Sequence, residues 1–240
     1  IKSYKNQDVN AITPRNLMAH HSGLPGDIYK GYFSQEPDYY TNVVSKLKDE
    51  YLAYPANSIF SYSSLGYDLL GRLIENVTSE DYASYMKSEV FRPLNMNNTY
   101  VETKDCMVNY SKSYEWNNFK DEGKIRDLPA GAIVSNVEDL SNFIKMVFAN
   151  GYFENNIFLD SLSVNETMTP QYPDAEMSKK TGSKIGMPWF FSIPNGNIYN
   201  AGRVLFYGGS STVFNSRIIL LPEYKMGVVV LTNSASGGKL

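Results

Sequence analysis

The chain has 240 residues, 42% of them hydrophobic and 14% aromatic, which is enough for one large globular domain or two modest ones. The net charge of −3 is small, and the sequence has no basic stripe of the kind that binds phosphate backbones, so nucleic acid is disfavoured as a partner. No apolar run approaches the roughly 20 residues of a membrane-spanning helix, and no signal peptide opens the sequence.

Helical signals dominate the first part of the chain. Thr13 and Pro14 predict a helix start, because threonine is a good N-cap and proline favours the first helical position. A second helix is predicted over residues 40–52. After the tripeptide Tyr62-Ser63-Ser64, apolar residues recur at helical spacing and predict a buried helix that begins at this tripeptide: Leu65, Leu69, Leu70, Leu73 and Ile74.

Two more helices are predicted before the pattern changes. Thr78, with acidic residues in the following turn, predicts a helix that Pro93 ends. Residues 97–127 are irregular and polar, which indicates loops and short strands. Ser135 and Glu138 stand at capping-box spacing and predict a helix with Gly151 as its C-cap.

After about Pro170 the pattern indicates β-structure. Residues 189–200 predict one hairpin with a turn over 194–197, and residues 214–232 predict a second. We therefore predict a single α+β domain, in which a mainly helical part, 1–169, packs beside an antiparallel β-sheet part, 170–240. Both ends, at Ile1 and after Thr232, suggest a truncated domain.

The histidines and the cysteine exclude several chemistries. His20 and His21 are the only histidines and do not accompany a G-x-S-x-G turn, so a serine–histidine–aspartate triad is not supported. Neither has a carboxylate or cysteine at ligand spacing, and we predict no metal site, no cofactor and structural roles for both. Cys106, the single cysteine, cannot form an internal disulfide, and we expect it to be a small half-buried residue.

Five segments, in order, resemble one protein family. Residues 12–25 (ITPRNLMAHHSGLP) and 60–71 (FSYSSLGYDLLG) are similar to "ITIRHLLTHTSGLP" and "FSYSNxGYxLLG". Residues 90–96 (VFRPLNM) and 129–140 (PAGAIVSNVEDL) are similar to "IFxPLGM" and "PAGGLxSTAxDL". Residues 207–216 (YGGSSTVFNS) are similar to "KTGSTGGFGS" or "HGGGTPGFxS". The chain thus resembles the serine hydrolases of the penicillin-binding protein and class C β-lactamase superfamily.

The resemblance implies acyl transfer through a serine ester. In this family a serine at a helix N-terminus attacks a carbonyl, a lysine one turn later helps to deprotonate it, and a tyrosine shuttles the proton. A serine hydroxyl needs such a base because it is otherwise a weak nucleophile. The resemblance assigns the tyrosine role to Tyr62, which would otherwise be interpreted as one packing residue among 19 tyrosines.

Two positions depart from the family pattern. Ser64 stands where the family has an asparagine that contacts substrate and lysine, and a serine has a shorter reach and one donor. Tyr207 stands where the family has lysine or histidine, so the cation that orients a substrate carboxylate is absent. Gly208 and Gly209 still permit close backbone approach, and the Ser210 N–H matches the strand half of the oxyanion hole. We predict substrate contacts at Ser64, Tyr207, Gly208, Gly209 and Ser210; the alternative for 207–210 is an ordinary glycine-containing edge strand.

The resemblance places the nucleophile motif S-x-x-K upstream of Ile1. Two internal matches, Ser45 to Lys48 and Ser84 to Lys87, lie inside predicted helices rather than at a capped start. Lys180-Thr181-Gly182 spells the strand motif K-T-G but sits in a predicted polar loop. We interpret all three as chance matches.

The sequence therefore predicts a serine hydrolase acting on an ester, amide or β-lactam, with this segment alone inactive. Two alternatives stay open: a non-catalytic pseudoenzyme or cell-wall peptide-binding module of the same fold, and a structural piece without function of its own. The expected partner is a small-molecule or peptide substrate. The resemblance favours an extracytoplasmic location, and the sequence leaves the oligomeric state open.

Overall fold

The computed structural model describes residues 1–3, 8–28, 30–101, 110–121, 123–182, 184–191 and 202–239. Eight α-helices are found in these ranges: α1 (Pro14–Met18), α2 (Tyr40–Lys46), α3 (Ser64–Thr78), α4 (Tyr82–Tyr85), α5 (Leu128–Gly131), α6 (Val137–Phe148), α7 (Ser161–Thr167) and α8 (Glu176–Thr181). Shorter helical turns are η1 (Val9–Ala11), η2 (Leu47–Asp49), the π-turn η3 (Met86–Phe91), η4 (Pro222–Tyr224) and η5 (Ala235–Lys239).

The main sheet is antiparallel and has the strand order β12-β11-β10-β9. Its strands are β9 (Phe190–Phe191), β10 (Leu205–Ser210), β11 (Asn215–Leu221) and β12 (Met226–Thr232). Four two-stranded pairs lie outside it: β1 (Phe33–Ser34) with β5 (Lys124–Ile125), β2 (Tyr100–Val101) with β6 (Ile133–Val134), β3 (Tyr114–Glu115) with β4 (Asn118–Phe119), and β7 (Tyr152–Phe153) with β8 (Asn156–Ile157).

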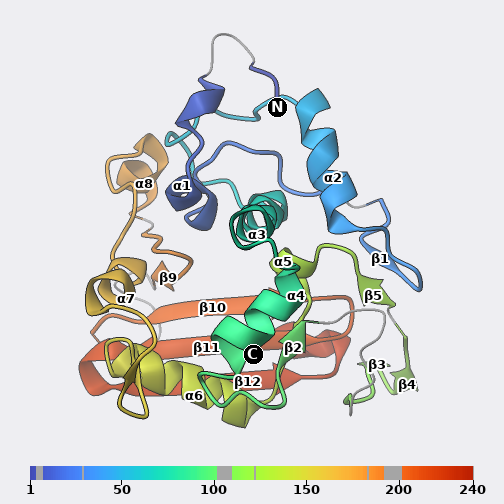
Figure 1. Cartoon of the computed structure of the whole chain (residues 1–240), viewed down its shortest axis with the longest axis vertical. Coiled ribbons are helices and arrows are strands. Elements are labelled where there is room, and N and C mark those ends of the chain that lie inside the picture. The colour runs from blue at the N-terminus through green and yellow to red at the C-terminus, as the bar shows by residue number, and fades with distance from the viewer. Residues whose placement is uncertain are drawn as a thin grey trace.

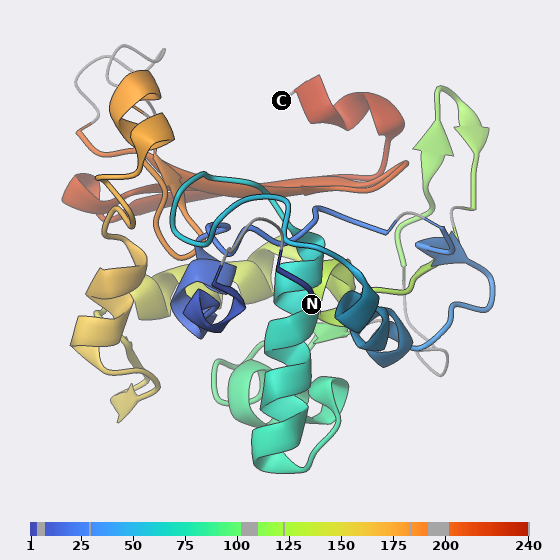
Figure 2. The same ribbon diagram turned by 90° about the horizontal axis from the view of Figure 1, so that it is seen from above.

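The helices cover one face of the main sheet. Figure 2 shows the sheet nearly edge-on, with α3 and α6 on one side and the C-terminal turn η5 on the other. Alternation along the strands sends Leu205 and Leu220 to the helical side, where both are buried in the largest apolar cluster, which also contains Ile144 of α6. Phe206 and Ile219, which are cross-strand neighbours, alternate to the other side. The core thus lies between the sheet and α6.

The central helix α3 carries two smaller apolar clusters. Leu65 packs with Val43 and Leu47 from the α2 region, and Leu69 and Leu70 pack against a cluster formed by Leu17, Leu24 and Leu52. Figure 1 shows α3 at the centre of the helical part, between α1 and α2 and above the sheet. The predicted α+β architecture, with helices packed beside an antiparallel sheet, is confirmed.

Several local predictions need correction. Asp81, not Thr78, caps α4, and Asn136, not Ser135, caps α6. The helix predicted over 40–52 ends at Lys46 and continues only as the turn η2. Lys180 and Thr181 lie in α8 rather than in a loop. Most of the hairpin predicted over 189–200, and Cys106, lie outside the described residues.

Candidate functional site

The tripeptide Tyr62-Ser63-Ser64 is fixed at the start of α3, as the sequence predicts. Ser63 is the N-cap: its hydroxyl accepts a hydrogen bond from the Gly66 N–H over 3.2 Å and donates one to the Pro25 carbonyl over 2.6 Å. The cap is buried, but the preceding Tyr62 side chain is 45% exposed. The helix therefore presents Tyr62 to solvent from an anchored position.

Tyr62 and Tyr207 come together, although 145 residues separate them in the sequence. Both side chains contact the ring of His20. Tyr207 lies on β10 with its ring stacked on Phe190 at a centroid distance of 5.6 Å. Burial, assisted by Tyr62 and Tyr67, raises the pKa of Tyr207 well above its ordinary value of 10. Tyr207 is thus a neutral hydrogen-bonding group beside the exposed Tyr62.

His20 lies directly behind this pair, and its proximity to the tyrosines was not predicted. Its side chain is fully buried, and its ring is 4.4 Å from the Tyr62 ring, centroid to centroid. Nδ1 accepts the Ser63 N–H over 3.2 Å, and Nε2 lies 3.5 Å from the Tyr207 hydroxyl. Burial, with the neighbouring His21 as a smaller cause, lowers the pKa of His20 to about 4, so the imidazole is neutral at pH 7. The only feature of the sequence that pointed to His20 was its position in the segment 12–25, which resembles a family motif.

Ser64 is the first residue of α3 and lies close to Tyr32. Its side chain is only 5% exposed, and it is one of the groups that influence the pKa of the Tyr32 phenol. Tyr32 is itself largely buried, which raises the pKa of its phenol above the ordinary range. The substrate contact at Ser64 stays a prediction.

Along the glycine segment of β10, one edge has no strand beside it among the residues that the structure describes. The Ser211 N–H donates to the Phe214 carbonyl over 2.9 Å and the Gly209 N–H to the Ser216 hydroxyl over 3.0 Å, so both point towards β11. Successive amides of a strand point to opposite edges, which directs the Gly208 and Ser210 N–H groups the other way. On that side β9 pairs only with Leu205 and Phe206. Among the described strands, none covers the edge from Gly208 to Ser210.

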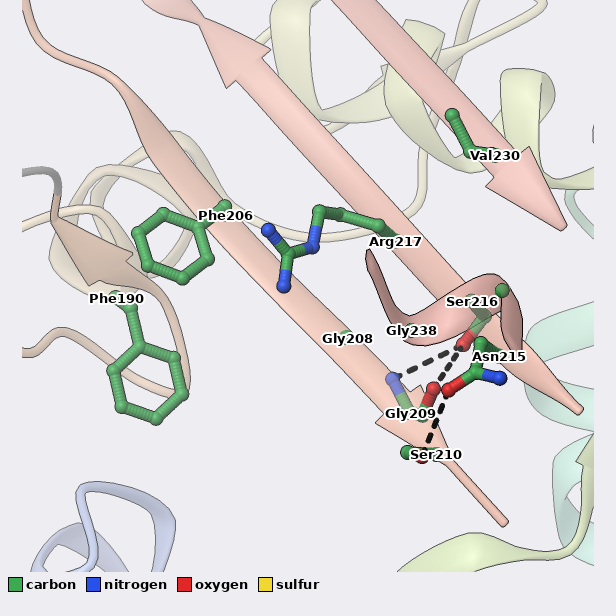
Figure 3. A pocket seen from close by; sticks show the side chains of 11 residues that line it. Phe190, Phe206, Gly208, Gly209, Ser210, Asn215, Ser216, Arg217, Val230 and Gly238 are labelled. Atoms are coloured by element: carbon green, nitrogen blue, oxygen red, sulfur yellow. Dashed lines mark hydrogen bonds between the residues drawn. The ribbon is translucent and has the colours of Figure 1, made fainter. Parts of the chain in front are cut away.

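A shallow pocket of about 290 Å³ adjoins the same glycine segment on the outer face of the sheet. Its walls include Gly208, Gly209 and Ser210 together with Phe190, Phe206 and Arg217, as Figure 3 shows. The Arg217 guanidinium lies over the Phe206 ring at 5.6 Å. Tyr62 and Tyr207 are not part of this lining, because Tyr207 alternates to the helical face. The cationic Arg217 of β11 therefore lies on the face of the sheet opposite Tyr207.

A group of buried charges lies behind Ser64. Asp68 follows it by one helical turn, and the side chains of Asp68, Asp127 and Arg126 are all buried. Arg126 forms a two-point ion pair with Asp127, in which Nη2 lies 2.8 Å from Oδ2. Burial first, and then the charge of Asp127, raise the pKa of Asp68 to about 9. Within the described ranges, no three histidine, cysteine or acidic side chains are arranged to hold a metal ion.

The internal motif matches lie apart from these contacts. The Ser45 hydroxyl donates to the Asn42 carbonyl of its own helix over 2.8 Å. The Ser84 N–H is held by the Asp81 cap of α4 over 3.0 Å. Lys180 and Thr181 occupy the last turn of α8, which ends at Gly182. Ser84 is therefore in the first turn of the short helix α4 and not in the interior of a longer helix as predicted, whereas Lys180 and Thr181 lie in a helix and not in the strand that their motif requires.

No described helix has the length and apolar character needed to cross a bilayer.

Comparisons with known proteins agree with this architecture. The family model described as Beta-lactamase matches residues 3–240. Protein flp of Staphylococcus aureus (strain N315) is 28% identical over 251 residues, covering 96% of this chain and 45% of flp. The chain therefore spans about half the length of this curated relative.

Solved structures show the same fold. A structure of SurE with D-Leu superposes with a TM-score of 0.75 at 20% identity, covering 96% of this chain and 52% of SurE. The class C β-lactamase from Rhodobacter sphaeroides superposes with a TM-score of 0.72 at 19% identity, covering 96% and 69%. Because the family model matches nearly every residue, from Ser3 to Leu240, the resemblance carried by the five segments is confirmed, and the chain belongs to the β-lactamase family.

Proposed function

We propose that Tyr62 is the proton carrier of a serine acyl-transfer site in a hydrolase of esters, amides or lactams. The observation that carries this proposal is the meeting of the exposed Tyr62 phenol with Tyr207 beside the free edge of β10. A serine hydroxyl must lose its proton as it attacks a carbonyl, and a phenol held beside it is a suitable acceptor. The proposal takes the serine and its lysine from a segment upstream of Ile1, as in the hydrolases that the sequence resembles.

The edge of β10 supplies the second part of the proposed site. The Ser210 N–H points away from β11 and is one of two donors that an oxyanion would need, the other being the amide of the nucleophile. Gly208 and Gly209 leave room for a substrate backbone at this edge. Because Tyr207 is neutral and Arg217 lies on the outer face, we propose a substrate without an essential carboxylate, such as a simple ester or amide.

The test uses the complete protein with a fluorophosphonate label and a chromogenic ester. Tyr62→Phe is expected to lower kcat/KM by about 100-fold or more, because it removes the proton acceptor but keeps the ring. Tyr39→Phe is the matched control, since Tyr39 is 74% exposed at the start of α2 and is expected to keep normal turnover. Absence of labelling at any serine, or normal turnover of Tyr62→Phe, would contradict the proposal.

A second candidate is a pseudoenzyme that binds a cell-wall peptide without cleaving it. The observation that favours it is the burial of Ser64, which is only 5% exposed and lies beside Tyr32, at the position where the family uses an asparagine towards the substrate. This candidate predicts that the complete protein binds a D-alanyl peptide in calorimetry but shows no turnover of ester or peptide. Turnover that disappears in Tyr62→Phe would exclude it.

A further inference from the structure

We propose that His20 is the positioning residue for Tyr62, holding its backbone and ring and orienting the Tyr207 hydroxyl beside it. This inference rests on the proposed role of Tyr62 and adds a residue that stands outside the tyrosine and strand motifs.

His20 holds the backbone on both sides of Tyr62. Its carbonyl accepts the Ser61 N–H over 2.8 Å, and its Nδ1 accepts the Ser63 N–H over 3.2 Å. The backbone of His20 has a φ of +55°, in the left-handed region that ordinary residues seldom adopt. Its ring lies against the Tyr62 ring at an interplanar angle of 32°. One residue thus fixes both flanking amides and one face of the phenol.

The hydrogen bond from Ser63 decides the tautomer of His20. A backbone N–H can only donate, so Nδ1 must be the unprotonated nitrogen of a neutral ring, and the proton is on Nε2. Nε2–H then donates to the Tyr207 hydroxyl, 3.5 Å away. The hydroxyl hydrogen of Tyr207 is then left for another acceptor, and the neighbouring Tyr62 phenol is the one that we propose. The observed series runs in one direction, from Ser63 through His20 to Tyr207.

A donor placed beside the Tyr62 oxygen, together with the contact between the His20 and Tyr62 rings, holds the phenol in one orientation. Correct orientation of a reacting group acts on the rate of the chemical step. The titratable groups that face His20 are His21, Asp27 and the tyrosines 62, 67 and 207. Burial lowers the pKa of His20 to about 4, so the direction of the series does not change near neutral pH.

The experiment compares His20→Asn with His21→Asn in the complete protein. Asparagine tolerates the left-handed backbone and its amide oxygen can still accept the Ser63 N–H, but it is too short to reach Tyr207. His20→Asn is expected to lower kcat for the ester about tenfold with little change in KM, because the phenol loses its orientation while the substrate contacts remain. Tyr207→Phe is expected to lower kcat as well.

His21→Asn is the matched control, because His21 makes a different hydrogen bond, to the Ala19 carbonyl over 2.7 Å, and stacks on Tyr172. It is expected to leave kcat and KM unchanged. A structural role alone for His20 predicts less folded protein but an unchanged kcat per labelled site. An unchanged kcat per labelled site in His20→Asn would therefore overturn the proposal.

Nitrogen NMR of histidine-labelled complete protein gives a second measurement that needs no turnover. The proposal predicts a neutral His20 with a protonated Nε2 and an unprotonated Nδ1, identified by loss of its signals in His20→Asn. The opposite tautomer or an imidazolium at neutral pH would overturn it. If the protein shows the predicted tautomer but no serine labelling, the proposed function fails while the hydrogen-bond geometry stands.

Discussion

Asp68 shows how a single buried carboxyl group in this molecule responds to pH. Its pKa is raised from 3.8 to about 9, mainly by burial, so the folded protein keeps a proton that the unfolded chain loses. Below about pH 4 both states are protonated, and the contribution of the neutral carboxyl to stability is fully present. Between about pH 4 and pH 9 the unfolded state alone ionises, so stability falls as the pH rises.

We expect Asp68→Asn to remove this dependence. The free energy of unfolding of the unmodified protein should fall between about pH 5 and pH 9, and that of Asp68→Asn should fall less over the same range. Urea denaturation at a series of pH values measures both. Asp174→Asn, an exposed carboxylate, is the control and should keep the original slope. Equal slopes for Asp68→Asn and the unmodified protein would show that Asp68 is ionised in the folded state.

Local motifs in the sequence identified some residues of the candidate site and missed His20. Tyr62 and Ser63 were identifiable because a local motif stands directly before an apolar helical pattern, and the structure places both at the start of α3. The roles of Tyr62 and of Gly208 to Ser210 stay predictions. His20 was assigned a structural role because no G-x-S-x-G turn and no metal-ligand spacing accompanies it. Its contact with Tyr207 spans 187 residues, and no local pattern in the sequence predicts such a contact.

Among the helices, α3 can pack closely against α5 because α3 has a glycine, Gly71, at the contact. A Cβ added at Gly71 would lie 2.6 Å from the Pro129 Cβ, whereas one added at Gly66 would meet Leu17 Cδ2 at an ordinary 3.5 Å. Alanine is a better helix former than glycine by about 1 kcal/mol. A glycine-to-alanine substitution therefore tests close packing at Gly71 and helix propensity at Gly66.

Gly71→Ala is expected to destabilise the protein by about 1–3 kcal/mol, because overpacking outweighs the gain in helix propensity. Gly66→Ala is expected to be neutral or stabilising by up to about 1 kcal/mol. Denaturant unfolding of the two variants beside the unmodified protein provides the comparison. If Gly71→Ala were as stable as Gly66→Ala, α3 and α5 would not be in close contact.

Predictions of elements succeeded where one local signal was unambiguous. Thr13 caps α1 with Pro14 in the first turn, and β11 and β12 form the hairpin predicted around Pro222. The start of α4 was misplaced because Thr78 and Asp81 are both good caps. In the structure the Thr78 hydroxyl bonds back to the Ile74 carbonyl over 2.8 Å, which keeps Thr78 inside α3.

Across the whole molecule, Arg126 contacts segments that are distant from it in the sequence. Its guanidinium donates to the Lys30 carbonyl over 2.7 Å and the Ile28 carbonyl over 2.8 Å, and pairs with Asp127. It also lies over the Tyr32 ring at 5.7 Å. This one side chain therefore connects the segment before β1 to the segment that leads into α5.

We expect Arg126→Ala to cost about 3–5 kcal/mol, because Asp127 stays buried without its partner and two carbonyls lose a donor. Arg203→Ala removes the exposed ion pair with Glu223 and should cost no more than about 1 kcal/mol. Guanidinium unfolding curves of the complete protein report both losses. A loss for Arg126→Ala no larger than for Arg203→Ala would mean that the buried pair adds little to stability.

The contact of His20 with Tyr62 and Tyr207 has a consequence for how the protein folds. The three residues come from an early loop, the start of the central helix and the last sheet, so they meet only after chain segments of 42 and 145 residues have closed. Contacts between residues so far apart in sequence carry a large loop-closure cost and form late in folding. We therefore expect partly folded molecules to have much helix but no assembled contact between the two tyrosines and His20.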